Sequence, residues 1–399
     1  MSAPAPLVGI RVIEVGNFMA VPFCGMQLAD LGADVIKVEN PSGGDLTRAA
    51  GPFIEGESSN FVRLNRNKRS VALDLKSDQG KAAFLALVAS ADILIENLRP
   101  GTMHGLGLDY DALKVRSPRL IYLAATGFGS SGPYKDLAGL DIIAQGMSGL
   151  MSITGEPGRA PAKVGVPIAD LTCGLYATIA VVAALRARDR DGVGQFIDVS
   201  LFESAVSLAV WEAGRFFATG DVPQPAGSAH QSIAPYQAVR SSDGYFTFGA
   251  NSQAHWLRVA SLFELEGLVH DVRFETNALR ITHRAELIAA IEAVTTTQTT
   301  QCWTARLGEA GIPCGPIWTF DRVFADEHLA ARDFFRDAPH TTLGPVRQLG
   351  SPMRFSETPV VLDRAGPLLG EHTAELLREA GLSDTEIAAL SRSNAERTR

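Results

Sequence analysis

Asp170 is a single carboxylate between two apolar stretches, VGVPIA (164–169) and LTCGLYATIAVVAALRAR (171–188). The second stretch is typical of a buried helix with a basic last turn, and Asp170 would then be its N-cap, accepting hydrogen bonds from the first free backbone N–H groups. A second interpretation stays open beside it. The positive end of a helix dipole favours an ionised carboxylate, and an ionised aspartate can attack an activated carbonyl and form a covalent intermediate.

A basic run in an otherwise acidic chain is the second feature with possible chemistry. The segment RLNRNKRSVALDLK (63–76) carries the cations Arg63, Arg66, Lys68, Arg69 and Lys76. One interpretation is a solvated surface, and the other is a phosphate-binding edge, because Arg and Lys pair strongly with phosphate oxygens. A strand over 70–75 would put Leu73 and Leu75 on one face and Asp74 and Lys76 on the other. That arrangement would suit a nucleotide, which has a flat ring and phosphates.

The spacing of three glycines gives a weaker motif. Gly127, Gly129 and Gly132 spell G-x-G-x-x-G after an apolar run. A dinucleotide site also needs a helix that opens there and an acid that ends the next strand. Pro133 and Tyr134 follow instead, so we expect a glycine-rich turn and no dinucleotide.

The histidines are scattered along the chain, and none pairs with another at helical spacing. His230 is the most interesting of them, because it lies beside Gln231 and Ser232 in a segment rich in Gly and Pro. Ligand contacts are common in loops of this kind, so His230 is a candidate substrate residue. P-loop, G-x-S-x-G and H-E-x-x-H motifs do not occur, and the enzyme classes that use them lose support.

The composition is that of a globular protein with material for a sizeable core. The 399 residues are 46% hydrophobic and 20% charged, and the net charge of −8 argues against general binding to nucleic acid or to an anionic membrane. The four cysteines, Cys24, Cys173, Cys302 and Cys314, have no zinc spacing. We expect a cytoplasmic protein with free thiols, no metal, no signal peptide and no apolar stretch long enough to span a bilayer, the longest lying around 177–185.

Alternation of short β-branched runs with helical runs predicts an α/β fold. Strands are expected at 8–15, 34–39, 70–75, 91–97, 119–126 and 195–201. Helices are expected at 23–33, after Ser77 as an N-cap, and from Leu171. Strands separated by helices of this length form βαβ units and a parallel sheet.

The composition changes at 220–237, which holds three prolines and little periodicity. A strand at 244–250 and helices near 252–264, 283–295 and 300–310 follow, and they indicate a smaller α+β domain. We predict a large domain over 1–205, a linker over 206–228, the small domain over 229–325, and a linker with a return to the large domain over 326–399. Ser383 and Glu386 predict a capping box at the last helix.

Segments along nearly the whole chain, taken in order, resemble the class III coenzyme A transferases, the family of formyl-CoA transferase. They include GIRVIEVGNFMAVPFCGMQLADLGADVIKVENPSGGD, LNRNKRSVALDLKSDQGK, ADILIENLRPGTMHGLGLDY, GVPIADLTCGLYATIAVVAAL and PLLGEHTAELL. The resemblance implies a Rossmann-like large domain, an interlocked homodimer, and a CoA thioester as substrate with no permanently bound cofactor.

The resemblance also implies roles for individual residues. Asp170 matches the family nucleophile, and Asp141 matches an acid close to the reaction centre. The positions that match CoA-contacting residues are Met19, Ala20, Leu73, Lys76, Asn97, Leu98 and Arg99. Asn40, Gly105 and Ala138 stand where formyl-CoA transferase has basic residues, and the glycine-rich loop of that enzyme is absent, so the resemblance does not extend to its formyl-CoA and oxalate specificity.

The segment GSAHQSIAPYQAVRSSDGY (227–245) is similar to the branch that moves CoA from succinyl-CoA to dicarboxylates such as glutarate. We therefore expect a CoA-transferase with an aspartyl-CoA intermediate, with His230 and Gln231 as substrate residues. An α-methylacyl-CoA racemase is the first alternative, although Leu140 stands where racemases have a histidine. A non-catalytic protein that binds CoA thioesters is the second.

Overall fold

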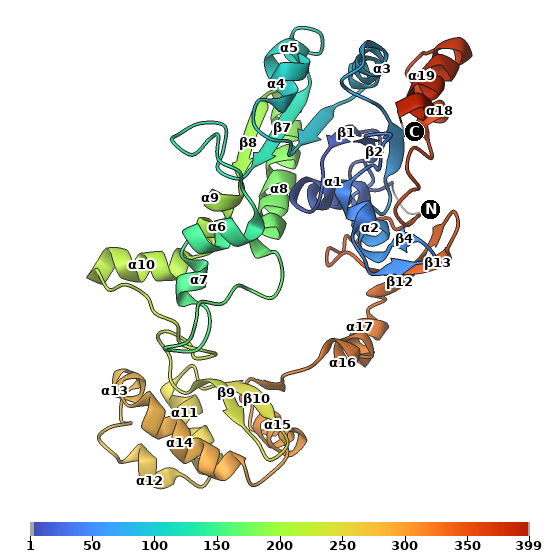
Figure 1. Cartoon of the computed structure of the whole chain (residues 1–399). Helices are drawn as coiled ribbons and strands as arrows, with labels where there is room; N and C mark the ends of the chain where they lie inside the picture. The colour runs from blue at the N-terminus through green and yellow to red at the C-terminus, as the bar shows by residue number, and fades with distance from the viewer. Residues whose placement is uncertain (1–3, 398–399) are drawn as a thin grey trace. The chain divides into compact units, whose positions relative to one another are not determined.

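The computed structural model describes residues 4–397, with the side chains of 4–392, and contains a six-stranded parallel sheet (Figure 1). Its order is β5-β2-β1-β6-β7-β8, which is the doubly wound order of Rossmann folds, with the first and fourth strands side by side at the centre. The strands are β1 (Arg11–Val15), β2 (Asp34–Glu39), β5 (Arg69–Ala72), β6 (Ile93–Glu96), β7 (Ile121–Thr126) and β8 (Phe196–Ser200). The predicted α/β fold with a parallel sheet is confirmed.

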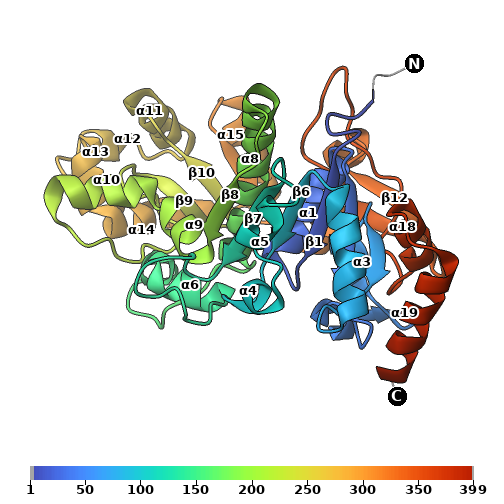
Figure 2. The ribbon, with the colours of Figure 1, turned by 90° about the horizontal axis from the view of Figure 1, so that it is seen from above.

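The two faces of the sheet are covered by different helices, and Figure 2 shows α3 and α8 on opposite sides. Side chains of α3 (Asp78–Ala89) share one apolar cluster with α18 (Thr373–Glu379), α19 (Asp384–Arg397) and alternate residues of the strands, such as Ile13 and Ile36. On the other face, α1 (Ala20–Asp30) packs against α8 (Ile168–Asp191), and α8 also lies against β7 and β8. Ser77 caps α3 as predicted, because its hydroxyl accepts from Gly80 N–H at 3.0 Å.

One predicted strand ends early. The strand expected at 70–75 stops at Ala72, because the Asp74 carboxylate accepts from Lys76 N–H at 2.9 Å and turns the chain out of the sheet. Leu73, Asp74, Leu75 and Lys76 therefore do not alternate between two faces, and all four line one pocket.

Shorter elements connect these layers or extend from them. They are η1 (Leu46–Ala49), β3 (Phe53–Ile54), β4 (Glu57–Ser58), α2 (Ser59–Leu64), α4 (Thr102–Leu106), α5 (Tyr110–Lys114), α6 (Asp141–Met147), α7 (Leu150–Ile153), α9 (Leu201–Ser207) and α10 (Val210–Thr219). The strands β12 (Phe335–His340) and β13 (Gly344–Leu349) form a hairpin. The predicted capping box is present, because Ser383 N–H donates to Glu386 and Glu386 N–H donates to Ser383 Oγ.

Residues 151–162 and 215–327 form a second compact unit, and the rest of the described chain forms the first. The second unit contains the antiparallel sheet β11-β10-β9, from β9 (Tyr236–Arg240), β10 (Tyr245–Gly249) and β11 (Cys314–Pro316). Its helices are α11 (Gln253–Leu262), α12 (Glu266–Val269), α13 (Asn277–Thr282), α14 (Arg284–Thr295), α15 (Thr300–Glu309) and α16 (Phe320–Phe324), and α17 (Glu327–Ala331) follows at its boundary. An apolar core around Trp256, Phe263 and Trp303 joins these helices to the sheet.

The helix α8 has the length and apolar composition needed to cross a membrane, and no other helix of the described residues has both. The sequence interpretation of this stretch as too short was wrong, because the helix begins at Ile168 and runs for 24 residues. Half of its most apolar window is buried within the protein, as in the core helix of a globular fold. Its packing against α1 and the sheet accounts for that burial.

Candidate active site

Asp170 lies in the first turn of α8, which begins at Ile168. The N-cap position belongs to Pro167, whose own side chain makes no capping hydrogen bond. The interpretation of Asp170 as the N-cap is therefore wrong: the residue is three positions further along, and its carboxylate is not used as the cap. The side chain remains available for chemistry.

The environment of Asp170 opposes its negative charge. Burial raises the pKa of its carboxyl group to about 7, and the negative charge of Asp141 contributes to the rise. The helix dipole favours the ionised form, but desolvation and the charge of Asp141 raise the pKa all the same. A carboxylate with this pKa is more basic than usual, and functional sites often contain groups perturbed in this way.

A hydrogen-bonded clamp holds the start of α8. Asp141 Oδ1 accepts from Ala169 N–H at 2.9 Å, and its Oδ2 accepts from Gln145 Nε2 at 2.7 Å. Gln145 Oε1 in turn accepts from Val164 N–H at 3.0 Å, and the Gln145 side chain is fully buried. The clamp fixes the backbone on both sides of the turn that precedes Asp170. Sequence reasoning missed Gln145, although an amide four residues after an acid on one helix is a recognisable pair.

The first turn of α1 lies close to the first turns of α8. A Cβ atom on Gly174 would lie 2.7 Å from Ala20 O and 3.4 Å from Cys24 N, so only glycine allows this approach. Gly174 is one helical turn beyond Asp170. The predicted residues Met19, which is the N-cap of α1, and Ala20 are thus brought to the neighbourhood of Asp170.

A pocket of about 260 Å³ lies at the carboxyl ends of β1, β2 and β5 and is lined by three predicted residues, Leu73, Lys76 and Leu98. Gly16 and Asn17 form another part of its wall. The side chain of the predicted residue Asn97 does not line this pocket. Its amide instead bonds to both the N–H and the C=O of Asn17, each at 2.9 Å. In doubly wound sheets, ligands bind where the strand order reverses, which here is beside β1.

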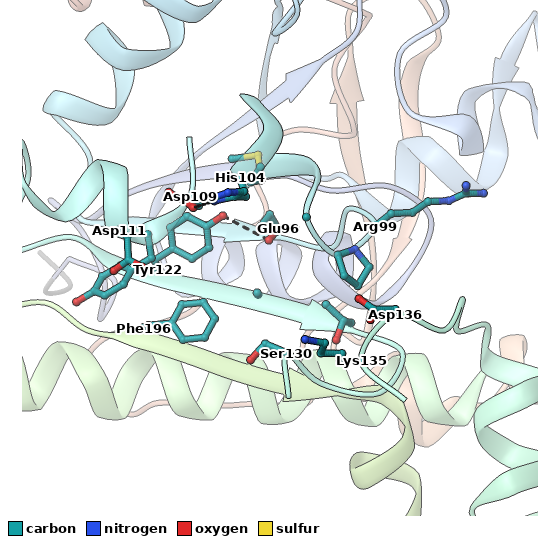
Figure 3. A pocket seen from close by; sticks show the side chains of 16 residues that line it. Glu96, Arg99, His104, Asp109, Asp111, Tyr122, Ser130, Lys135, Asp136 and Phe196 are labelled. Carbon is teal, nitrogen blue, oxygen red and sulfur yellow. Dashed lines mark hydrogen bonds and ion pairs between the residues drawn. The ribbon is translucent and has the colours of Figure 1, made fainter. Parts of the chain in front are cut away.

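Arg99 lines a different pocket of about 500 Å³, which Figure 3 shows over β7 and β8. Lys135 also lines it, together with a cluster of aromatic rings that includes Tyr122 and Phe196, whose centroids are 5.8 Å apart. Glu96 lies in this pocket, and burial raises its pKa to about 7 although Leu98 N–H donates to it. Of the predicted CoA residues, Leu73, Lys76 and Leu98 thus line one pocket and Arg99 lines another.

Apart from Lys76, the cations of the basic run form neither a solvated surface nor a free phosphate-binding edge. Three of its cations form ion pairs with carboxylates elsewhere in the chain. Arg66 lies 2.6 Å from Asp30 and Lys68 lies 2.8 Å from Glu14. Arg69 lies 2.7 Å from both Asp34 and Glu379. Arg63 donates to Ser59 O. Lys76 is exposed and lines a pocket, so it alone keeps the predicted role.

His230 and Gln231 belong to the second unit, whereas Asp170 belongs to the first. The ring of His230 stacks on Tyr236, with centroids 4.9 Å apart, and its Nδ1 accepts from Ser232 N–H at 3.2 Å. These contacts leave the ring orientation well defined. That His230 and Gln231 hold the substrate stays a prediction.

The glycine motif at 127–132 is a turn, as expected. Gly129 and Gly132 have positive φ angles of 88° and 82°, which glycine adopts without strain. A Cβ on Gly127 would lie 2.5 Å from the Cα of Gly139, so the two backbone segments around these glycines pass each other closely. Among the described residues, no group of three or more His, Cys, Asp or Glu side chains is arranged to hold a metal ion.

Residues 7–373 match the family described as CoA-transferase family III. The chain belongs to this family. The transferase is 39% identical over 381 residues to a succinate–glutarate CoA-transferase of Agrobacterium fabrum, an alignment that covers 94% of this chain and 95% of the relative. It is 37% identical to a succinyl-CoA:glutarate CoA-transferase of Mus musculus, covering 94% and 86%. A solved CAIB/BAIF family protein from Brucella suis, 40% identical, superimposes with a TM-score of 0.85 over 95% of this chain and all of that one.

Proposed function

We propose that this transferase moves CoA from succinyl-CoA to a short dicarboxylic acid, with glutarate as the first candidate acceptor, and that Asp170 carries CoA between the two. The relatives named for succinyl-CoA and glutarate support the substrates. The observation that carries the mechanism is the environment of Asp170, whose pKa of about 7 reflects a partly buried carboxylate beside a second one. Such a carboxylate gains from being converted into a neutral ester, anhydride or thioester.

The proposed reaction is a series of acyl exchanges with no net redox change. The Asp170 carboxylate attacks the succinyl-CoA carbonyl, the C–S bond breaks, and a mixed anhydride and CoA thiolate form. The thiolate then attacks the Asp170 carbonyl, which releases succinate with one aspartate oxygen and leaves aspartyl-CoA. The acceptor carboxylate attacks this thioester, and the released thiolate finally attacks the acceptor side of the new anhydride, which frees Asp170.

Water must be kept from these intermediates, because hydrolysis would waste the thioester. Neighbours of Asp170 in α8 meet this need: Ala169 and Cys173 are fully buried. The first turn of α1 beside Gly174 provides backbone N–H groups at a helix start, and we assign them to the developing oxyanion. Lys76 and Arg99 are assigned to the phosphates of CoA.

We also propose a homodimer. The face of α8 turned away from the core exposes Leu175, Tyr176, Ile179 and Val182 at 40–64% of their surface. No side chain of α10 is buried, and Trp211 and Phe217 are exposed at 64% and 83%. Exposed apolar faces of this size mark interaction surfaces. Light scattering coupled to gel filtration should give twice the chain mass.

The test of the proposed function is a transfer assay with succinyl-CoA and a panel of acids, followed by mass analysis of the acyl-CoA products. Glutarate should yield glutaryl-CoA, and butyrate, which lacks the second carboxylate, should react at least about tenfold more slowly. Equal rates with both acids would refute dicarboxylate selectivity. His230→Ala should abolish the preference, and a preference that survives would place the held carboxylate elsewhere.

Isotope labelling tests the mechanism separately. With acceptor carboxylate labelled in ¹⁸O, one labelled oxygen should stay on Asp170 after the first turnover and then pass into released succinate. A direct transfer between the two acids, without an aspartyl intermediate, would leave Asp170 unlabelled in peptide mass spectra. Unlabelled Asp170 after many turnovers would therefore rule out the covalent route.

A further inference from the structure

A cluster of buried ions adjoins the pocket that Lys76 lines, and one of its members, Asp45, is part of the pocket wall. Lys37 Nζ is 2.8 Å from both Glu14 Oε1 and Asp45 Oδ2, and Lys68 Nζ is 2.8 Å from Glu14 Oε2. All four side chains have no exposed surface. Burial alone would lower the pKa of Lys37, but Glu14 and Asp45 raise it above its usual value. For Lys68 burial outweighs the attraction of Glu14 and lowers its pKa to about 8. The cluster thus brings two basic and two acidic side chains together.

The cluster makes directional contacts to the backbone of the loop between β1 and α1. Lys37 Nζ donates to Gly16 O at 2.8 Å, and Asp45 Oδ1 accepts from Phe18 N–H at 3.3 Å. Phe18 has a φ of 61°, a left-handed conformation that is unusual for a bulky residue. Backbone held in this region needs support from its surroundings. The contacts of Lys37 and Asp45 on either side of Asn17 supply it.

The loop occupies a place that matters for the proposed reaction. Gly16 and Asn17 line the pocket with Lys76. Two residues after Phe18 the chain reaches Ala20, whose carbonyl packs against Gly174, one turn beyond Asp170. The loop therefore connects the pocket assigned to CoA with the helix that carries the proposed nucleophile.

We propose that Glu14, Lys37 and Asp45 are positioning residues that fix the loop 16–18 as the wall of the CoA-thioester pocket. The inference rests on the proposed function, which gives the pocket its ligand. Buried ion pairs are an ineffective way to stabilise a fold, since apolar side chains of similar volume do as well or better. Their directional contacts can, however, select one backbone conformation.

The protein contains a matched control. Asp30, at the opposite end of α1, accepts hydrogen bonds from Arg66 at both carboxylate oxygens and is almost fully buried, as is Arg66. It lines neither of the two pockets. The variants Asp30→Asn and Asp45→Asn therefore remove the same charge from two buried ion pairs, and only the second pair holds the loop. In Asp45→Asn an amide group that donates replaces the Oδ2 atom 2.8 Å from Lys37 Nζ, so Lys37 loses this partner and its contact to Gly16 O is no longer fixed.

The experiment compares wild type and both variants by thermal unfolding, by calorimetric titration with CoA, and by succinyl-CoA transfer kinetics. Both variants should lose thermal stability. Asp45→Asn should weaken CoA binding and raise KM for succinyl-CoA about tenfold with a smaller change in kcat, as for one lost contact to a charged group. Asp30→Asn should keep CoA affinity within about twofold. Equal affinities in wild type and Asp45→Asn would overturn the inference.

A double variant separates position from stability. Lys37→Met alone leaves two carboxylates against Lys68, and adding Asp45→Asn restores the charge balance. The double variant should unfold at a higher temperature than Lys37→Met, while CoA affinity stays low because Gly16 O has lost its donor. Affinity that recovers together with stability would assign the cluster a purely structural role. Wild-type protein that binds no CoA would instead overturn the proposed function.

Discussion

Two acidic side chains of the first unit, the buried Asp45 and the partly buried Asp170, lie in opposite electrostatic surroundings. Asp45 sits against Lys37, and although burial raises the pKa of its carboxyl, the lysine and the donors from Thr47 lower it below its usual range. Asp170 meets a second acid, Asp141, and its pKa rises to about 7. A buried carboxylate with a cation is suited to hold structure, whereas one without a cation is destabilised and is suited to react.

Removing the unbalanced charge should give the largest effect. Asp170→Asn deletes the proposed nucleophile and should lower transfer at least about a thousandfold, because the covalent route is lost. Far-ultraviolet circular dichroism should confirm that the fold is kept. Near-normal turnover in this variant would show that the Asp170 carboxylate is not needed for CoA transfer.

The same variant should also become more stable, in contrast to Asp45→Asn. Because the pKa of Asp170 is higher in the folded than in the unfolded state, its ionisation costs the fold stability as pH rises from about 4 to about 7. At pH 8 the full penalty applies, so Asp170→Asn should gain up to about 4 kcal/mol. At pH 4 the gain should vanish. Chemical unfolding at the two pH values measures the difference, and a variant that is destabilised at pH 8 would contradict it.

Of the two carboxylates in this contrast, the sequence predicted only the role of Asp170. The lone acid between apolar stretches identified Asp170, because a local pattern was enough. The buried cluster gave no such signal, since Lys68 lies in a run of basic residues that looks solvated while its partner Glu14 is 54 positions away. Arg69 forms an ion pair with Glu379, which lies 310 positions further along the chain. Ion pairs across such separations depend on the tertiary fold, and no local pattern reveals them.

The secondary structure shows the same division. The strands at the centre of the sheet were predictable, because runs such as DVIKVE have a β-branched, buried pattern that depends on neighbours in the sequence. The caps at Ser77 and Ser383 were predictable for the same reason. The assignment of 151–162 to the second unit was missed, since it follows from contacts such as Gly227 N–H to Gly155 O.

The clamp at the start of α8 offers the next largest effect. Gln145→Leu keeps the side-chain volume but breaks the bonds to Asp141 and Val164 N–H. The turn before Asp170 should loosen, and kcat should fall about 10- to 100-fold, because small misplacements of reacting groups are costly. Gln348→Leu is the control, since Gln348 is equally buried and bonds only to Val62 O in a different region. A similar fall in kcat for both variants would show that the clamp contributes only to the stability of the fold.

The pH profile tests the carboxylate pair directly. The attacking form of Asp170 is ionised, so kcat/KM for succinyl-CoA should rise with pH through about 7. Asp141→Asn removes one cause of the raised pKa, and the midpoint should move to lower pH. It should not reach the value of a free aspartate, because burial is the larger cause. A midpoint that stays in place would exclude Asp141 as a cause.

Charges that are exposed to water differ from both buried carboxylates. Removing such a charge should have the smallest effect on transfer. Lys76 and Arg99 are exposed and line the two pockets. Because water and salt screen such charges, Lys76→Ala and Arg99→Ala should each raise KM for succinyl-CoA only about fivefold, with little change in kcat. The rise of KM with ionic strength should be shallower in both variants. Arg190→Ala, at the exposed far end of α8, should change neither quantity.

If only one of Lys76→Ala and Arg99→Ala raises KM, the CoA phosphates lie in the pocket which that residue lines. If neither does, the path assigned to CoA is wrong.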